Sequence, residues 1–146
     1  MAATETLTRQ EGPHVPALSI VLTTPETYEV IRTTVSHLRR QEGREQLELV
    51  IVAASRAALE FDKAGLDGAE LAEFGSYQIV EVGKVRSVGA GNAAGVRRAK
   101  APVIVLAEDH AFPQPNWAAE LIRAHQEPWA AVGPGIANAN PNTIVS

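Results

Sequence analysis

Three side chains that carry or can carry charge, Glu108, Asp109 and His110, follow directly after the apolar run VIVL at 103–106. A short apolar run rich in branched residues is typical of a buried strand. Carboxylates suit Mg²⁺ and Mn²⁺, and an imidazole shifts the preference towards Mn²⁺ or another transition ion. If the strand continued through the cluster, Glu108 and His110 would share one face, because side chains alternate along a strand. The alternative is a solvated loop whose charges cap the helix that starts near Asn116.

Residues 89–95 read GAGNAAG and allow two interpretations. The first is the G-x-G-x-x-G/A fingerprint of a dinucleotide-binding loop, with Glu108 or Asp109 as the acid that binds the ribose. The matching residues are Gly89, Gly91 and Ala94. The fingerprint requires a tight turn directly after a strand, whereas residues 83–88 separate GAGNAAG from the preceding predicted strand. An NAD(P)-binding oxidoreductase domain is therefore the alternative hypothesis for function.

The second interpretation of GAGNAAG is a helix with one small face. Gly91, Gly95 and Ala99 are spaced by four residues, so they would line one side of that helix. Each glycine costs about 1 kcal/mol of helix propensity relative to alanine, which implies a compensating need for close packing. We favour this interpretation over a loop that binds phosphate.

Short apolar runs alternate with stretches of helical spacing along the chain. The predicted strands are 18–22, 47–52, 77–82, 103–106 and 129–136. This alternation predicts a mostly parallel, doubly wound, Rossmann-like α/β sheet flanked by helices. Ligands of such sheets bind beyond the carboxyl ends of the strands. Thr23 and Thr24 follow the first strand, residues 53–55 follow the second, and the charged cluster at 108–110 follows the fourth, so all are expected at one rim.

The predicted helices connect these strands. Thr24 can cap the first helix, and Pro25 suits its first position. The other helical stretches are 87–100 and 117–125. Residues 56–75 are predicted to form one helix or two short ones, because Gly65 and Gly68 interrupt a single helix.

Composition places the chain among ordinary globular proteins. Its 146 residues suffice for one domain with a core, and its net charge of −4 gives no general attraction to nucleic acid or anionic membranes. The lack of cysteine excludes disulfides and thiolate metal sites, and is compatible with the cytoplasmic location that we expect. Residues 1–16 are predicted to be a polar tail without the features of a signal peptide, and no apolar run reaches the roughly 20 residues of a membrane span. The remaining histidines, expected to be structural or solvated, are His14, His37 and His125.

Several segments taken together resemble a known family. They are LSIVLTT, LELVIV, RSVGAGNAAGVRRAKAPVIVLAEDHAFPQPNW and VGPG. They resemble the nucleotide-sugar-binding half of family 2 glycosyltransferases, which have the A-type glycosyltransferase fold. The resemblance covers roughly residues 17–140 and is sharpest where AGNAAGVRRAKAPVIVL is followed by EDH and PQPNW. It implies that 17–146 is a donor-binding half, which binds a nucleoside diphosphate sugar.

The resemblance implies a role for each matching residue. Glu108, Asp109 and His110 occupy the family's acidic metal motif, which holds Mn²⁺ or Mg²⁺ on the donor diphosphate, and Glu108 would also contact the nucleotide. Arg86 matches an arginine that reaches the nucleotide in some members. Thr23 and Thr24 lie in the loop that lines the base and ribose pocket.

The sequence departs from the family pattern at two places. Ala53 and Ala54 stand where the family usually has one or two aspartates, one of which commonly contacts the base. His110 replaces the usual last aspartate of the metal motif, and histidine is itself a competent metal ligand.

The resemblance also implies that donor binding and the catalytic base belong to different halves of the protein. The family's acceptor half carries the catalytic base, so we expect that base beyond Ser146 and assign no catalytic residue here. We expect the 146-residue chain alone to bind donor weakly, to self-associate and to transfer no sugar to an acceptor. A non-catalytic module that binds a nucleotide or a partner chain is a third hypothesis.

Overall fold

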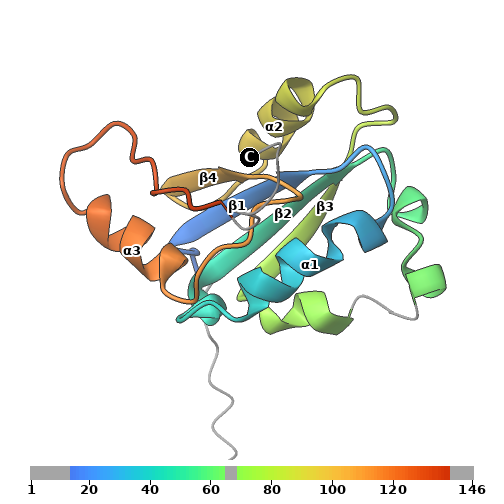
Figure 1. The fold of residues 1–146 in the computed structure, drawn as a ribbon. Coiled ribbons are helices and arrows are strands. Elements are labelled where there is room, and N and C mark those ends of the chain that lie inside the picture. Colours follow the sequence, from blue (N-terminus) through green and yellow to red (C-terminus); the bar gives the residue numbers. More distant parts are fainter. Residues whose placement is uncertain (1–13, 65–68, 139–146) are drawn as a thin grey trace, which may run out of the picture.

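The sheet of the computed structural model, which describes residues 14–64 and 69–138, is parallel throughout (Figure 1). Its strands are β1 (Leu18–Thr23), β2 (Leu47–Ala53), β3 (Ser76–Glu81) and β4 (Val103–Ala107). They lie in the order β3-β2-β1-β4. The predicted parallel α/β sheet is therefore confirmed, and four of its five predicted strands are present.

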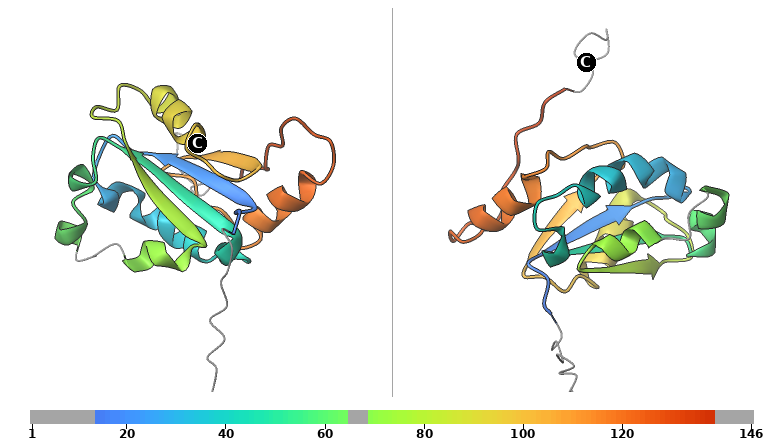
Figure 2. Two further views of the ribbon diagram at one scale, coloured as in Figure 1. Left: turned by 180° about the vertical axis from the view of Figure 1, so that it is seen from behind. Right: turned by 90° about the horizontal axis from the view of Figure 1, so that it is seen from below.

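Helices cover both faces of the sheet (Figures 1 and 2). They are α1 (Tyr28–Arg39), α2 (Val88–Val96) and α3 (Trp117–Ala124), with the short 3₁₀ helices η1 (Arg44–Gln46), η2 (Ala57–Leu59), η3 (Phe61–Ala64) and η4 (Ala69–Glu73). One face carries α2, the other carries α1, and α3 lies beyond β4 on the side of α1. Among the described helices, none combines the length and the apolar character that crossing a membrane requires.

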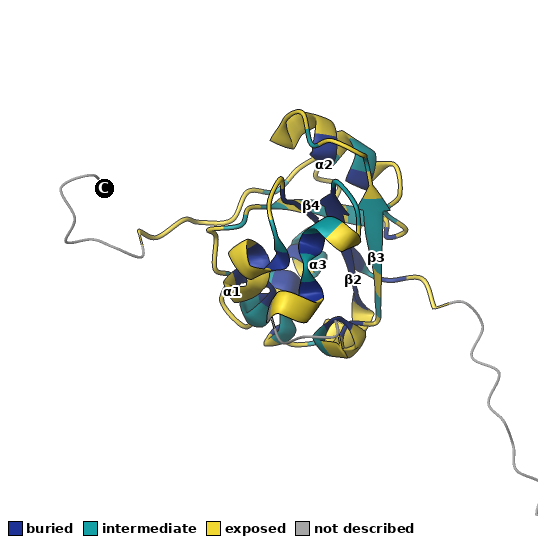
Figure 3. Cartoon of the chain, turned by 90° about the vertical axis from the view of Figure 1, so that its right-hand side faces the viewer, coloured by how far each residue is buried: buried dark blue, intermediate teal, exposed yellow. Residues whose placement is uncertain are grey.

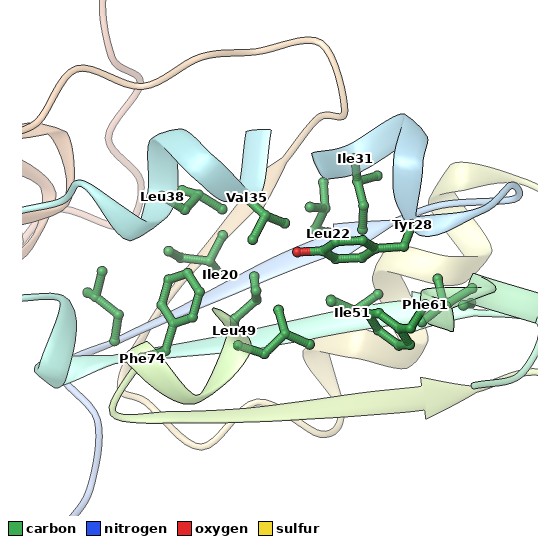
Figure 4. Packing of buried hydrophobic residues seen from close by; sticks show 14 of the residues in the cluster. Ile20, Leu22, Tyr28, Ile31, Val35, Leu38, Leu49, Ile51, Phe61 and Phe74 are labelled. Carbon is green, nitrogen blue, oxygen red and sulfur yellow. The ribbon is translucent and has the colours of Figure 1, made fainter. Parts of the chain in front are cut away.

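The core has two layers of unequal size. The larger layer lies between the sheet and α1, where the helix presents Ile31, Val35 and Leu38 to β1 and β2 (Figure 4). The smaller layer lies under α2 and is built on three valines, Val21, Val50 and Val52. Every residue of β1 and β2 is buried, whereas β3 and β4 are only partly buried (Figure 3). Covering on both faces explains why the two central strands have nearly continuous apolar sequences.

Two glycines let α2 approach the sheet closely. Gly91 and Gly95 are the buried residues of this helix. A Cβ atom on Gly95 would lie 2.9 Å from Cγ2 of Val52 and closer still to Val21. A Cβ atom on Gly91 would lie 2.9 Å from Oγ1 of Thr23. Both distances are shorter than side chains tolerate, so the prediction of a closely packed small face is confirmed for Gly91 and Gly95. Ala99, the third predicted residue of that face, lies beyond the end of the helix.

The predicted strand at 129–136 is wrong. Residues 131–138 have no regular structure, and no described strand pairs with the segment. Pro134 lacks an amide donor, and glycines flank it on both sides, which weakens any strand. Trp129 is 64% exposed and Ile136 is 95% exposed, so these two large apolar side chains gain little burial that would hold the segment extended.

The first helix begins later than predicted. Its N-cap is Thr27, and α1 starts at Tyr28 rather than near Pro25. The amide of Thr24 donates to the carbonyl of Val52 at 2.9 Å, which extends the pairing of β1 with β2 by one residue. The Thr24 hydroxyl accepts from the amide of Glu26 at 3.2 Å. Thr24 therefore ends the strand instead of capping the helix.

Two further predictions need correction, and others fall outside the described residues. The described parts of the stretch 56–75 form separate 3₁₀ helices instead of one or two α-helices, and α2 ends at Val96 rather than at residue 100. Gly65 and Gly68, most of the predicted polar tail (1–13) and the last residues (139–146) lie outside the described part of the chain.

A buried carboxyl group explains where α2 ends. Glu48 on β2 is 1% exposed and accepts hydrogen bonds from three other segments. Its Oε2 accepts from the hydroxyl of Ser19 and, at 2.8 Å, from the amide of Lys100. Its Oε1 accepts from the side-chain amide of Gln78 at 2.8 Å. Glu48 thus joins three strands to the connection after α2, which cannot continue as a helix while the Lys100 amide donates to the sheet.

Replacing Glu48 by glutamine is expected to lower the free energy of unfolding by about 1–3 kcal/mol, because the amide NH₂ cannot accept and leaves a buried donor unpaired. Urea denaturation of the variant and wild type would measure the difference. Glu45→Gln, at an exposed position of η1, is the matched control and should leave stability within about 0.5 kcal/mol of wild type. An unchanged urea midpoint for Glu48→Gln would show that the three hydrogen bonds contribute nothing net.

Candidate functional site

The carboxyl ends of β1 and β4 form the rim that carries most of the predicted site residues. In the register of these strands Leu22 lies opposite Ala107, the last residue of β4. Thr23 therefore lies next to the point where Glu108 leaves β4. Because the sheet is parallel, both strands end at the same edge, as predicted from the sequence.

The structure brings Glu108, Asp109 and His110 into mutual contact. Nδ1 of His110 lies 2.7 Å from Oδ1 of Asp109, and Nε2 lies 3.2 Å from Oε2 of Glu108. The imidazole thus lies between the two carboxylates. The strand does not continue through the cluster, because β4 ends at Ala107 and the cluster lies in a turn, so the alternation of faces expected for a continued strand does not apply.

The two carboxylates raise the pKa of His110. The hydrogen bond to Asp109 is the main cause; desolvation opposes it, and the negative charges of Asp109 and Glu108 add to the increase. A raised pKa favours the protonated ring more than in a free histidine. A metal ion binds the neutral ring, so it would compete with protonation at His110.

The donor types of the cluster fit a divalent cation that arrives with a ligand. Among residues 14–64 and 69–138, no three His, Asp or Glu side chains are arranged as a ready-made ion site. Mg²⁺, however, is commonly bound by one or two carboxylates together with phosphate oxygens and water, rather than by an all-protein cage. Asp109 and Glu108 supply two carboxylates, and both lie close to the imidazole of His110.

The segment that carries the cluster is attached to α1 and to the residues just after it. The hydroxyl of Thr34 donates to the carbonyl of Asp109 at 2.7 Å. Further along, the rings of His37 and Phe112 lie 5.3 Å apart. The side chain of Gln41 holds the end of the segment. It donates to the carbonyl of Gln114 at 2.7 Å and accepts from the amide of Ala118, in the first turn of α3, at 2.9 Å.

Sequence analysis missed Thr34 and Gln41. Both are polar and buried, with exposures of 0% and 2%. Thr34 lies on the side of α1 that otherwise presents apolar residues, whereas Gln41 lies two residues after the end of the helix. A polar residue on the apolar face of α1 was the pattern that could have identified Thr34.

The predicted nucleotide residues near β1 are engaged within the protein. The hydroxyl of Thr23 donates to Oδ1 of Asn92 at 2.7 Å, and both Thr23 and Thr24 are buried. Asn92, which no prediction included, thereby joins α2 to the end of β1. Arg86 is exposed and lies one residue before Ser87, whose hydroxyl caps α2 by accepting from the amide of Ala90 at 3.1 Å. The beginning of α2 lies over the end of β1, so Arg86 belongs to the same rim.

The dinucleotide interpretation of GAGNAAG is not favoured. Gly89 and Gly91 lie within α2 rather than in a tight loop after β3. The buried side of Gly91 contacts Thr23, so the glycine serves helix–sheet packing.

A surface hollow of about 460 Å³ lies at the opposite edge of the sheet. Its lining residues are Glu42, Gly43, Gln46, Ala119, Ile122, Arg123 and Gln126. They belong to the segment before β2 and to α3, and they include no predicted site residue. The candidate site at the rim and this hollow are therefore separate features.

Comparison with known proteins identifies the fold. No protein-family model matches the chain. No curated protein matches it either. The crystal structure of residues 1–349 of S. aureus TarS matches with a TM-score of 0.59 and 12% identity, over 86% of this chain and 40% of that one. The chain has the glycosyltransferase fold found in the N-terminal part of TarS.

Two more TarS structures agree with this assignment. TarS 1–349 in complex with UDP matches with a TM-score of 0.59 and 12% identity, over 86% of this chain and 39% of that one. The longer TarS structure matches with a TM-score of 0.57 and 13% identity, over 75% of this chain and 20% of TarS. The chain thus spans at most about two fifths of the TarS chains that it matches. These matches confirm the predicted resemblance at the level of the fold.

Proposed function

We propose that this chain binds the nucleoside diphosphate sugar of a family 2-type glycosyltransferase, with a divalent cation between the protein and the diphosphate. The main support is the position of Glu108, Asp109 and His110, which are gathered at the carboxyl end of β4 and beside the end of β1. The fold adds support, because a TarS structure with this fold was solved in complex with UDP.

In this proposal the cluster at 108–110 holds Mn²⁺ or Mg²⁺. Asp109 and Glu108 would supply carboxylate oxygens, and His110 would supply a ring nitrogen after losing its proton. The cation would neutralise the charge that develops on the departing diphosphate. The exposed guanidinium of Arg86, beside the beginning of α2, would add a second positive charge for the nucleotide. Thr23 and Thr24 would form the floor of the base and ribose pocket.

The proposed reaction of the whole protein is sugar transfer. The bond between the anomeric carbon and the diphosphate oxygen would break, and a bond from an acceptor hydroxyl to that carbon would form. A general base would take the hydroxyl proton. Ala53 and Ala54 offer no carboxylate to the base of the nucleotide, so both UDP and GDP belong in the binding test.

Wild-type protein is expected to bind UDP or GDP in the presence of Mn²⁺ and at least about tenfold more weakly with a chelator, because the cation neutralises diphosphate charge. Isothermal titration calorimetry with each nucleotide, with Mn²⁺, with Mg²⁺ and with EDTA would measure this. NAD in the same buffers is the comparison ligand.

The outcomes of this titration separate the hypotheses. Equal affinity with Mn²⁺ and with EDTA would contradict the metal role. Tight NAD binding without metal would instead support a dinucleotide-binding domain. Failure of all three nucleotides to bind would favour a non-catalytic module.

A further inference from the structure

The cluster at 108–110 lies in a segment that has no regular structure of its own. Between β4 and α3 the described chain forms neither helix nor strand. One hydrogen bond within this segment, from the amide of Ala111 to the carbonyl of Glu108, is long at 3.3 Å. The conformation of the cluster must therefore depend on contacts with other parts of the molecule.

One of these contacts is made at the centre of the cluster. The Thr34 hydroxyl donates to the carbonyl oxygen of Asp109 at 2.7 Å, across 75 positions of sequence. A carbonyl held by a hydrogen bond fixes the plane of the peptide that joins Asp109 to His110. It thereby restrains the directions in which both side chains leave the backbone.

Thr34 is unusual for its place in the helix. It is fully buried near the middle of α1, among residues that are otherwise apolar. Threonine has a lower helix propensity than leucine or alanine, and a helical threonine hydroxyl usually bonds to a carbonyl of the preceding turn. Here the hydroxyl donates instead to a different segment. A valine of nearly the same shape would fill the same space, so the hydroxyl itself is what this position supplies.

We infer that Thr34 is a positioning residue that holds Asp109 and His110 in the arrangement needed to bind a divalent cation with a nucleoside diphosphate. This inference rests on the proposed function. Thr34 touches neither metal nor nucleotide and acts through the main chain of Asp109. The contact of His37 with Phe112 supports the same segment further along.

The test compares Thr34→Val, Thr34→Ser and the matched control Thr33→Val in the full 146-residue chain. Thr33 is the neighbouring threonine on α1 and is exposed, so its substitution changes no contact with the cluster. One measurement is the Kd of UDP and of GDP with Mn²⁺ and with EDTA. The other is ¹⁵N relaxation of residues 109–111 in metal-free protein, which reports backbone order and requires no ligand.

Thr34→Val is expected to weaken Mn²⁺-dependent nucleotide binding by about tenfold or more, as loss of a group that orients metal ligands typically does. It should also lower the backbone order parameters at 109–111. Thr34→Ser should restore both properties, and Thr33→Val should match wild type. Thr34→Ala serves as a second hydroxyl-free variant if Thr34→Val folds poorly by circular dichroism.

The failures of the two proposals are distinguishable. If wild type binds nucleotide only with Mn²⁺ and the folded hydroxyl-free variant binds equally well, the positioning role is overturned while the proposed function stands. If wild type itself shows no metal-dependent binding, the proposed function fails and the positioning role fails with it. A loss in Thr34→Ser as large as in Thr34→Val would also overturn it, because the serine keeps the hydroxyl.

Discussion

Asp109→Ala is expected to abolish Mn²⁺-dependent nucleotide binding, raising the Kd of the bound nucleotide at least about 100-fold. A carboxylate ligand beside a diphosphate contributes several kcal/mol of charge stabilisation, and each 1.4 kcal/mol corresponds to a factor of ten in Kd. The substitution keeps the carbonyl that accepts from Thr34, so the backbone contact is preserved. Calorimetric titration of wild type and variant, with Mn²⁺ and with EDTA, would measure the loss.

Three further substitutions provide Kd values with which the effect of Asp109→Ala can be compared. Glu108→Ala and His110→Ala should weaken binding less than Asp109→Ala, because both variants keep the Asp109 carboxylate that we propose as the main ligand of the cation. Asp62→Ala, at an exposed position of η3, removes the same group far from the rim and should leave the Kd unchanged. The metal role would be refuted by an Asp109→Ala protein that retains the metal-dependent affinity of wild type.

Gly95→Leu is expected to lower the free energy of unfolding by more than about 3 kcal/mol, at the upper end of overpacking effects. Even the first added carbon atom would lie 2.9 Å from Cγ2 of Val52, and Val21 would be closer still. Relief would require α2 to move away from the sheet. Thermal or urea denaturation followed by circular dichroism would measure the change.

Gly89 provides the matched control for this prediction. It lies in the same helix, and a Cβ atom there would meet nothing within 4 Å. Gly89→Leu should therefore be neutral or stabilise by up to about 1 kcal/mol, since leucine has the better helix propensity. If both substitutions cost the same, close packing of α2 would not be the reason for its buried glycines.

The two central strands were predictable because their patterns depend on burial alone. β1 and β2 are covered on both faces, so their apolar runs could be recognised without knowing the partners. Helix ends were less predictable, because contacts distant in sequence decide them. Glu48 accepts from the amide of Lys100 and so determines where the connection after α2 begins. The backbone of Thr24 pairs with Val52, which shifts the start of α1.

The location of the candidate site at the rim could be predicted from the sequence, but the contacts that support it could not. The alternation of strands and helices, and the position of Glu108, Asp109 and His110 after an apolar run, were enough to locate the rim. The contacts of Thr34 with Asp109 and of Thr23 with Asn92 join residues 75 and 69 positions apart. No local pattern contains such pairs. Only the packing of α1 and α2 on opposite faces of the sheet brings them together.

The order β3-β2-β1-β4 also has a consequence for how the molecule assembles. β1 pairs with β2 soon after it in the chain, but it pairs with β4 only when Leu18 meets Val103. Pairings between distant residues form slowly, because a long loop must close before any contact compensates for its entropy. Within the described sheet we therefore expect the pairing of β1 with β4, which completes the rim, to form last. A ligand bound across that rim recognises only chains in which β4 has docked, and by mass action it stabilises that final step.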